Sequence, residues 1–363
     1  MARPPEVLIV GAGVIGTSVA WHLASRGVTR IRVIDRGAAP GAGSTSRATG
    51  GFRAQFGSDI NVRLSLLSRR KLQTFEKDVG VDAGYRPTGY LFLAEAADKL
   101  QRLREAQRIQ HAAGLDEAKI VSAQEAARLN PTVESARVVG GAFCPTDGFI
   151  DPMAILQGYL GAAQRLGVQF EFGVQFRPAM QAETVVNAAG AWAGMVSDVP
   201  IHPLRRQVLP TKGTGTLTPD LPMTIFAGDA FHFRVRDGRV LLLWPGGRDP
   251  SDPFDATVDP AWVAHVEALA RERVPGLRGV PFDRAGAWAG LYDMSPDEHA
   301  IVGRVGSTVF VNGSSGHGVM HAPALGQLAA EIILDGRARS LDIDALRPSR
   351  FAEKRPIASV PVF

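Results

Sequence analysis

Two short apolar runs near the start of the chain are spaced as buried strands that flank one helix. The first run, Val7–Val10, leads into a glycine-rich turn, and the second, at 31–34, ends at Asp35. Short continuous apolar runs bounded by turn residues are typical of strands that are covered on both faces. The pattern therefore predicts a strand, a helix and a second strand over residues 7–35, as in an α/β fold.

Stretches further along the chain carry apolar residues at helical spacing. Ser58 and Asp59 precede one stretch and Gly80 follows it, so we expect a helix capped at Ser58-Asp59 and ended by Gly80. Pro152 suits the first turn of another helix, which Gly167 stops. Further helices are expected at 96–113 and 323–334.

Strand-like segments dominate the middle of the chain. Asp237-Gly238 separates two apolar runs, 231–236 and 239–244, which is a strong hairpin signal. Because helix and strand patterns alternate on either side, we predict an α/β plus α+β chain, with a β-rich domain inserted into an α/β frame. Other expected strands lie at 88–94, 168–172, 184–187 and 308–311.

Composition narrows the class of protein. The 363 residues, 45% of them hydrophobic, can bury a full core and suggest two domains. No apolar run approaches the roughly 18 residues of a membrane helix, and the first residues lack a signal peptide's apolar segment, so a cytoplasmic protein is expected. Cys144 is the single cysteine, and no histidine or acid spacing suits a metal, so neither a disulfide framework nor a metal site is expected.

The formal charge of +4 does not indicate a nucleic-acid partner. Basic residues are interspersed with acidic ones throughout the chain. The densest basic groups, at 69–71 and 102–108, fall on stretches expected to be helical that also carry acids. A solvated helix face explains these groups better than a surface that follows phosphates.

The turn after the first strand has the spacing of a dinucleotide-binding motif. Gly11 permits a tight turn, Gly13 lets backbone N–H groups approach a pyrophosphate, and Gly16 lets helix and strand pack closely. Asp35, at the end of the second strand, would hold a ribose hydroxyl. The motif predicts a nucleotide cofactor, and by itself it leaves open an NAD-dependent dehydrogenase.

Two later segments also indicate contact with a ligand. Residues 37–57 are rich in glycine, alanine, serine and threonine, which is typical of a loop that contacts a ligand. Near the other end, Ser314-Ser315-Gly316-His317-Gly318 opens a helix whose N–H groups suit the anionic charge of a reduced flavin around N1 and O2. Glycines at 316 and 318 allow close approach.

Six motifs occur in one order along almost the whole chain: VLIVGAGVIG with Asp35, STSRATGGFR, TGYLFLA, TVVNAAGAW, GLYDMSPDEHAIVG and VNGSSGHGVMHAPALG. In these motifs the chain resembles the D-amino-acid oxidase superfamily of FAD enzymes. The branch is that of sarcosine oxidase β-subunit, dimethylglycine dehydrogenase and glycine oxidase. The resemblance implies a Rossmann-like FAD-binding domain of the glutathione-reductase (GR2) type with an inserted antiparallel β-sheet substrate domain.

The resemblance also implies a domain division and a set of cofactor contacts. The FAD-binding domain is expected at 1–83, 142–204 and 293–363, and the substrate domain at 84–141 and 205–292. FAD is expected to be non-covalent, because Gly290 stands where some relatives attach it through cysteine and the first loop has Arg47 but no histidine. FAD contacts are expected at Gly11, Gly13, Val14, Ile15, Gly16, Asp35, Arg36, Ser44, Thr45, Ser46, Gly50, Gly51, Val174, Ala188, Gly190, Trp192, Gly290, Gly316, His317, Gly318, Val319 and Met320.

The expected substrate site combines one anchor with an apolar wall. Arg53 matches the arginine that binds the substrate carboxylate in the sarcosine oxidase branch. Met320 stands where the branch has a second, lysine ligand, so the substrate could differ or another anchor, Arg47 or Lys212, could serve. Tyr292 and His232 are the other expected members of the catalytic pocket.

The function expected from the resemblance is FAD-dependent oxidation of a small amino acid or N-methyl amino acid of the sarcosine, glycine, D-amino acid or proline type. A hydride would pass from the α-carbon to flavin N5. O2 or an electron carrier would be the acceptor, and a dehydrogenase is favoured because no lysine lies in a motif that matches the oxygen-activating one. The alternatives are an NAD-dependent dehydrogenase and a flavin-carrying subunit of a larger complex. A homo-oligomer or a partner subunit is possible from the sequence.

Overall fold

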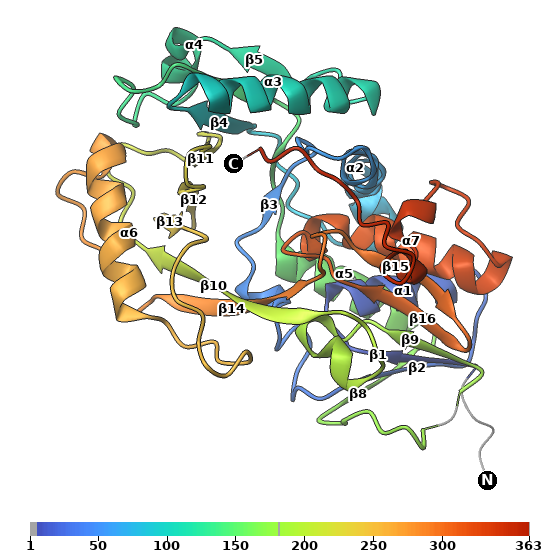
Figure 1. The fold of residues 1–363 in the computed structure, drawn as a ribbon. Coiled ribbons are helices and arrows are strands. Elements are labelled where there is room, and N and C mark those ends of the chain that lie inside the picture. Colours follow the sequence, from blue (N-terminus) through green and yellow to red (C-terminus); the bar gives the residue numbers. More distant parts are fainter. Residues whose placement is uncertain (1–5, 181, 363) are drawn as a thin grey trace.

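The computed structural model describes residues 6–180 and 182–362. Within these residues the strands form a six-stranded sheet, an eight-stranded sheet and a short two-stranded pair (Figure 1). The pair joins β3 (Gly51–Phe52) to β7 (Gly148–Phe149). Short 3-10 helices are η1 (Thr45–Arg47), η2 (Gly190–Met195), η3 (Pro275–Leu277), η4 (Asp344–Leu346) and η5 (Pro348–Arg350).

The six-stranded sheet is built around the first strand of the chain. Its order is β15 (Ile301–Val305), β16 (Thr308–Asn312), β9 (Thr184–Asn187), β1 (Val7–Val10), β2 (Ile31–Asp35) and β8 (Gln169–Phe172). All neighbours are parallel except the β15–β16 hairpin. The predicted strand, helix and strand at 7–35 is thus confirmed, with α1 (Val14–Ala24) as its helix.

Helices cover this sheet and explain why its strands are continuously apolar. Apolar residues of α1, α2 (Asp59–Val79) and α7 (Gly318–Asp335) pack with those of β1 and β2 into one core. Helix α5 (Pro152–Arg165) contacts α1 as well. Every residue of β1 is buried, because Val7 and Ile9 face the helices, while Leu8 and Val10 pack against apolar residues between β8 and β9 and against those that flank η2.

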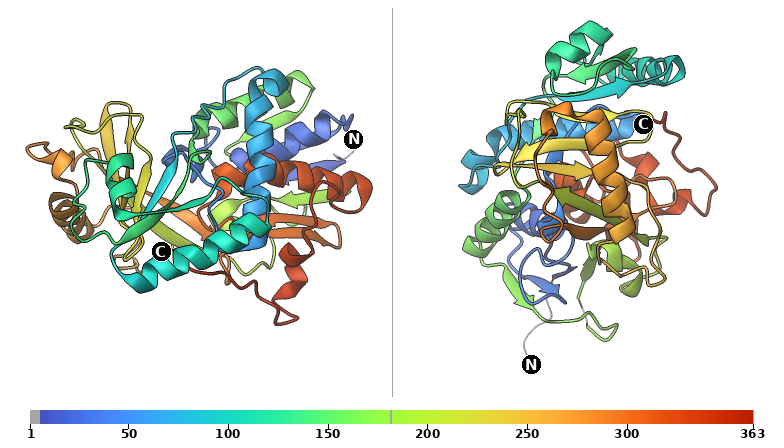
Figure 2. Two further views of the ribbon diagram at one scale, coloured as in Figure 1. Left: turned by 90° about the horizontal axis from the view of Figure 1, so that it is seen from above. Right: turned by 90° about the vertical axis from the view of Figure 1, so that its left-hand side faces the viewer.

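The eight-stranded sheet forms the other part of the molecule. Its order is β14 (Trp288–Met294), β10 (His202–Pro210), β13 (Arg239–Leu243), β12 (His232–Arg236), β11 (Met223–Phe226), β4 (Tyr90–Ala94), β6 (Gly140–Cys144) and β5 (Lys119–Val121). Helix α6 (Pro260–Arg273) packs against it, and Figure 2 shows α6 and the β12–β13 hairpin at the end remote from β1 and β2. Helices α3 (Ala97–Ala112) and α4 (Ala123–Leu129) flank it.

Most predicted elements are confirmed, and the hairpin gives the clearest local reason. Asp237 and Gly238 have φ of 51° and 69°, which is the conformation that a two-residue hairpin turn with right-handed strand twist requires. Helix α6 was not identified from the sequence. The signal was present, because Asp259 precedes Pro260 and its side chain accepts a hydrogen bond from the N–H of Ala261.

Two details of the predicted helices are wrong. Ser58 occupies the cap position of α2 but makes no capping bond, because its hydroxyl lies 2.8 Å from Nε2 of His299 instead. Helix α7 begins at Gly318, which agrees with the expectation that residues 314–318 open it, but the stretch predicted as helical, 323–334, begins five residues too late. A proline is tolerated inside it because tertiary contacts serve the neighbouring backbone: the N–H of Ala324 donates to Ser68 Oγ at 3.2 Å.

The predicted domain boundaries stay a prediction. Strand β6 spans the boundary at 141/142 and strand β14 spans that at 292/293, and both belong to the eight-stranded sheet. Residues 1–5 and 363, at the ends of the predicted FAD-binding segments, lie outside the described residues. In the described part of the chain, no helix has the length and apolar character needed to cross a membrane.

Candidate active site

A cavity of about 720 Å³ is lined by residues from both large sheets. Its wall includes the turn after β1, the loop that contains η1, and the turn before α7. Strands β10, β12 and β14 supply the remaining wall. The cavity thus brings the first and last glycine-rich turns of the chain to one site.

The turn after β1 is closed tightly by its glycines and by Asp35. Gly11 has φ of 110°, and a Cβ there would overlap the carbonyl oxygen of Ala188. A Cβ at Gly16 would overlap the carbonyl oxygen of Gly11. The carboxylate of Asp35 accepts from the N–H groups of Ala12 and Gly37, both at 2.7 Å, so it fixes the turn while it lines the cavity.

The loop around η1 has protein neighbours that demand small residues. Thr45 Oγ1 accepts from the N–H of Val14 at 3.2 Å, and Ser44 Oγ donates to the carbonyl of Leu291 at 2.5 Å. A Cβ at Gly50 or Gly51 would overlap the Ile150 carbonyl or the Tyr90 hydroxyl, respectively. The glycines at 50 and 51 are therefore required by packing, whether or not they contact a cofactor.

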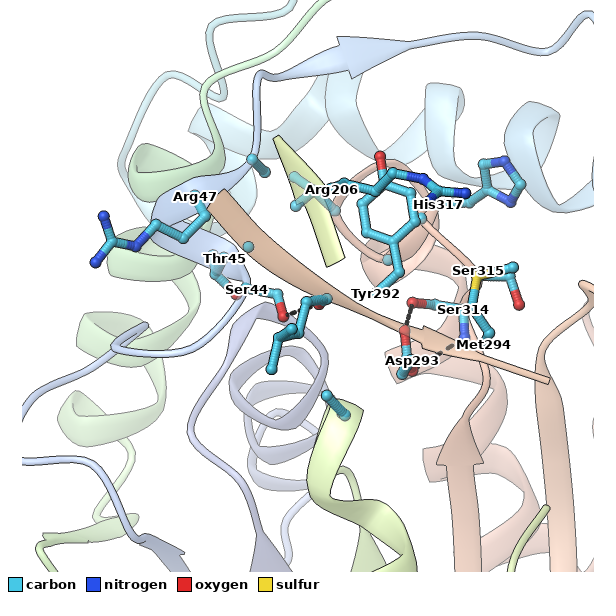
Figure 3. A pocket seen from close by; sticks show the side chains of 18 of the residues that line it. Ser44, Thr45, Arg47, Arg206, Tyr292, Asp293, Met294, Ser314, Ser315 and His317 are labelled. Atoms are coloured by element: carbon cyan, nitrogen blue, oxygen red, sulfur yellow. Dashed lines mark hydrogen bonds between the residues drawn. The ribbon is translucent and has the colours of Figure 1, made fainter. Parts of the chain in front are cut away.

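The turn before α7 is held by Asp293. Its carboxylate accepts from Ser314 N at 3.0 Å and from Ser314 Oγ at 2.6 Å, as the dashed lines in Figure 3 show. The turn then passes through Ser315 and Gly316, with φ of 49° and 88°, and a Cβ at Gly316 would overlap the Tyr292 ring. Asp293 thereby aims the N-terminus of α7 at the cavity, where N–H groups attract negative charge.

Arg53 lines the cavity from the segment between β3 and α2. Its guanidinium is buried, donates from Nη1 to the carbonyl of Gln55 at 2.5 Å, and lies 3.4 Å from Nε2 of His317. The guanidinium carbon is 3.9 Å from the centre of the Phe56 ring. Burial lowers the pKa of Arg53 to about 10, so the group stays charged at neutral pH.

Asp147 fixes the backbone that carries Arg53. Its carboxylate accepts from Ala54 N at 2.7 Å and from Gln55 Nε2 at 3.1 Å. The carboxyl is fully buried, and burial raises its pKa to about 6. Sequence reasoning missed this residue, because its partners are 93 and 92 positions away in the chain.

The other predicted catalytic residues also line the cavity. His232 is uncharged at neutral pH, since burial lowers its pKa to about 4, and its Nδ1 lies 2.8 Å from the carbonyl of Ala230. Burial raises the pKa of the Tyr292 phenol. Met320 is buried in the first turn of α7. Burial also lowers the pKa of His317 well below its usual value.

Most predicted contacts lie on the cavity wall, and a few do not. Gly16 is not part of the cavity lining, because it packs against the backbone of Gly11, and Ser46 is exposed outside the cavity. Arg47 lines the cavity but extends away from Tyr292 in Figure 3, and Lys212 is not part of the lining among the described residues. The remaining predicted contacts, including Arg36 over the Trp192 ring at 4.9 Å, line the cavity. Their roles toward a cofactor stay predictions.

Sequence reasoning missed Arg206 and the C-terminal segment as parts of this site. Arg206, on β10, lies with its guanidinium carbon 5.7 Å from the centre of the Tyr292 ring. Residues 359–362 line the cavity, and the N–H of Val360 donates to the carbonyl of Gly57 at 2.9 Å. No motif signals either feature, because both depend on contacts between segments far apart in the chain.

This arrangement fits an elongated dinucleotide. One continuous cavity joins the N-terminus of α1, where two glycines leave no room for side chains, to the N-terminus of α7, where Gly316 and Gly318 do the same. A Cβ at Gly318 would lie 2.8 Å from Ser314 Oγ. Two helix N-termini suit two separate regions of negative charge, such as a pyrophosphate and a flavin ring that gains charge on reduction.

Comparisons with known proteins identify the family. The family model described as "FAD dependent oxidoreductase" (DAO) matches residues 6–332. FAD-dependent oxidoreductase domain-containing protein 1 of Xenopus laevis is 26% identical over 98% of this chain and 84% of that protein, and glycine oxidase of Bacillus licheniformis is 24% identical over 96% and 98%.

A solved structure is similar over the full fold. L-proline dehydrogenase from P. horikoshii has a TM-score of 0.89 and 25% identity, covering 98% of this chain and 100% of that one. The family match decides between the FAD and NAD alternatives in favour of FAD. The chain therefore belongs to the DAO family of FAD-dependent oxidoreductases.

Proposed function

We propose that this protein oxidises the amine of a small amino acid or an N-methyl amino acid, with the substrate carboxylate held by Arg53. Relatives support an amino acid as the donor, since one is named glycine oxidase and a similar structure is an L-proline dehydrogenase. The proposal covers the sarcosine, glycine, D-amino acid and proline types. It concerns the cavity between the two sheets.

The observation that carries the proposal is the buried charge of Arg53 on the cavity wall. Its side chain lies among the Phe56 and Phe92 rings, 3.9 and 5.9 Å from the guanidinium carbon. A cation in such surroundings strongly favours a bound anion, because water cannot solvate it well. The planar guanidinium fork suits a carboxylate, and Asp147 holds the adjacent backbone in place through Ala54.

His232 lines the pocket as an uncharged side chain that can accept a hydrogen bond from the substrate amine. With the Ala230 carbonyl 2.8 Å from Nδ1, the ring carries its proton on Nδ1 and a lone pair on Nε2. Its lowered pKa, about 4, keeps the ring uncharged at neutral pH. Hydride loss requires a neutral amine, so the substrate ammonium gives its proton to water, and Nε2 of His232 then accepts a hydrogen bond from the neutral amine.

The reaction oxidises the C–N single bond of the substrate to a C=N double bond. Bound FAD supplies the hydride acceptor. The α-carbon loses its hydrogen with both bonding electrons, the nitrogen lone pair forms the C=N bond, and Arg53 keeps the carboxylate fixed while this happens. Water hydrolyses the resulting imine at the α-carbon to an oxo acid, and the nitrogen leaves as ammonia from a primary amino acid or as an alkylamine from an N-methyl amino acid. We further propose an electron carrier rather than O2 as the final acceptor, which peroxide measurement during turnover tests.

Anaerobic bleaching of the bound flavin by a panel of amino and N-methyl amino acids tests the function. We expect at least one amino acid to bleach the flavin of the isolated chain. Arg53→Ala should raise the substrate concentration for half-maximal reduction roughly 10²- to 10³-fold, since two hydrogen bonds to a charged partner contribute about 3–4 kcal/mol together. Arg53→Lys should show a smaller loss, because it keeps the charge and loses the fork.

Arg47→Ala tests the alternative anchor, because Arg47 also lines the cavity but extends away from Tyr292 (Figure 3). It should leave saturation unchanged. Unchanged saturation in Arg53→Ala, with FAD still bound, would contradict the anchor. If no amino acid bleaches the isolated chain, the alternative of a flavin-carrying subunit is favoured.

A further inference from the structure

Arg206 is a second arginine at the substrate end of the cavity. Strand β10 pairs antiparallel with β14, and the register places Leu204 opposite Tyr292 and Arg206 opposite Gly290. Directly opposed residues share a sheet face, as do residues two apart along one strand. Arg206 and Tyr292 therefore project from the same face, and both line the cavity.

The guanidinium of Arg206 lies beside Tyr292. Gly290, directly opposite, has no side chain, and the guanidinium carbon lies 5.7 Å from the centre of the Tyr292 ring. Figure 3 shows the two side chains next to each other, while Arg47 extends in the other direction. The neighbouring Arg205 differs, because its guanidinium donates to the carbonyls of Thr257 and Arg248 at 2.9 and 2.7 Å.

The guanidinium of Arg206 forms few hydrogen bonds with the protein. Among the described residues, its side chain makes one hydrogen bond, from Nη1 to the carbonyl of Arg205 at 3.2 Å. The acids that act on it electrostatically are Asp249 and Glu298, which are both exposed, and neither forms an ion pair with it within the described chain. Burial lowers the pKa of Arg206, so the guanidinium is poorly hydrated as well.

Two cations lie at this end of the cavity. Arg53 and Arg206 both act on the Tyr292 phenol and on His232, so the two cations share one region. Tyr292, His232 and His317 are uncharged at neutral pH. The buried acids nearby are already occupied: Asp147 binds Ala54 and Gln55, and Asp293 binds Ser314.

We propose that Arg206 binds a second carboxylate, and that the substrate is an amine that carries two carboxylates. The inference rests on the proposed function, since it names the substrate class of the same pocket. One carboxylate pairs with Arg53 and the other with Arg206, while the oxidised carbon lies between them. A monocarboxylic amine leaves the second guanidinium without a counter-ion, which costs affinity.

Two ethers that lack the oxidisable amine separate binding from catalysis. Oxydiacetate has two carboxylates, and methoxyacetate has the same backbone with one. Each is titrated into the FAD-loaded protein, and the change in flavin absorbance gives its Kd. We expect oxydiacetate to bind at least about tenfold more tightly, the ratio that 1.4 kcal/mol produces.

Arg206→Gln should bring that ratio to about threefold or less, and the Kd of methoxyacetate should change less than about threefold. Arg206→Lys, which keeps the charge, should keep part of the preference. The matched control is Arg205→Gln, whose arginine binds loop carbonyls away from the cavity and should leave the ratio unchanged.

Several results would overturn the proposal. Equal binding of the two ethers by the unsubstituted protein, or binding of neither, excludes a site for two carboxylates. Loss of FAD in Arg206→Gln assigns the residue to the cofactor instead, and equal loss for both ethers assigns it to general structure. Failure of the proposed function is a separate result, in which no amino acid bleaches the flavin whatever the ethers do.

Discussion

Asp297→Asn should destabilise the protein far more than a carboxylate-to-amide change at the surface. Asp297 and Arg350 form a bidentate pair, with both N–H···O distances at 2.9 Å and side chains only 2% and 1% exposed. Asp297 also accepts from the N–H of Ile357 at 3.0 Å. The substitution removes the counter-ion of the buried Arg350 guanidinium, which keeps only uncharged acceptors, namely backbone carbonyls and the single amide oxygen of the asparagine.

The magnitude follows from that burial. Removing one partner of a buried, hydrogen-bonded pair costs about 3–5 kcal/mol, because the other charge stays buried without a counter-ion. For 363 residues, at about 2.1 cal/mol/K of unfolding entropy per residue, this lowers Tm by roughly 4–7 °C. The matched control is Asp344→Asn, whose carboxylate pairs with Arg347 but is 76% exposed, and whose cost should stay below about 1 kcal/mol.

The effect should also depend on pH in a defined direction. Burial alone would raise the pKa of Asp297, but hydrogen bonds from Arg350 and Ile357 lower it to about 2. In the unfolded chain the pKa is about 3.9, so the folded state gains stability that is complete above about pH 4 and is lost as pH falls toward 2. The Tm difference between the unsubstituted protein and Asp297→Asn should therefore narrow below about pH 4.

Thermal unfolding followed by intrinsic fluorescence at pH 7 and at pH 3 measures both effects. Arg350→Met should restore part of the stability lost in Asp297→Asn, since the double variant no longer buries a lone charge. A Tm loss at pH 7 no larger than that of Asp344→Asn, or a difference that does not change with pH, would refute this reasoning.

Three further predictions concern the cofactor and the pocket. Gly16→Ala should purify without flavin absorbance, because the new Cβ overlaps the Gly11 carbonyl. The control Gly194→Ala should keep FAD, because no atom lies within 4 Å of the new Cβ. A Gly16→Ala protein that binds FAD would contradict the need for close packing at the turn. Gly57→Ala should raise KM while FAD stays bound, because the new Cβ overlaps the Val360 carbonyl and displaces residues 359–362, which line the cavity. Unchanged kinetics would show that residues 359–362 do not contribute to the site. Acid precipitation should release all flavin into the supernatant, and flavin retained on the protein would show covalent attachment.

The parts of this molecule that the sequence predicted well depend on near neighbours. The turn at Gly11 and Gly16 and the hairpin at Asp237-Gly238 are set by backbone conformation within a few residues. Ser58 occupies the predicted cap position, but its hydroxyl makes no capping bond because it lies beside the distant residue His299. Propensity at a helix end is a preference of about 1 kcal/mol, which one tertiary hydrogen bond can match.

The missed site residues have a common physical cause. Arg206 reaches the cavity through the pairing of β10 with β14, and a shift of one residue in that register would turn its side chain to the other face. Asp147 acts on Ala54 from 93 positions away. A local sequence pattern indicates neither strand register nor hydrogen bonds between distant residues, so these site residues could be identified only from the structure.

The position of β1 at the centre of the six-stranded sheet has a consequence for how the chain is made. During synthesis from the N-terminus, β1 can pair with β2 early, but its other neighbour, β9, is complete only at residue 187. Helix α1 lacks its contact with α7 until residue 335 has been made. One edge of the apolar strand β1 therefore stays unpaired until about half of the chain has been synthesised, and during this time aggregation competes with folding. A chain truncated before β9 would expose that edge permanently, and one truncated before α7 would lack the helix that packs on α1.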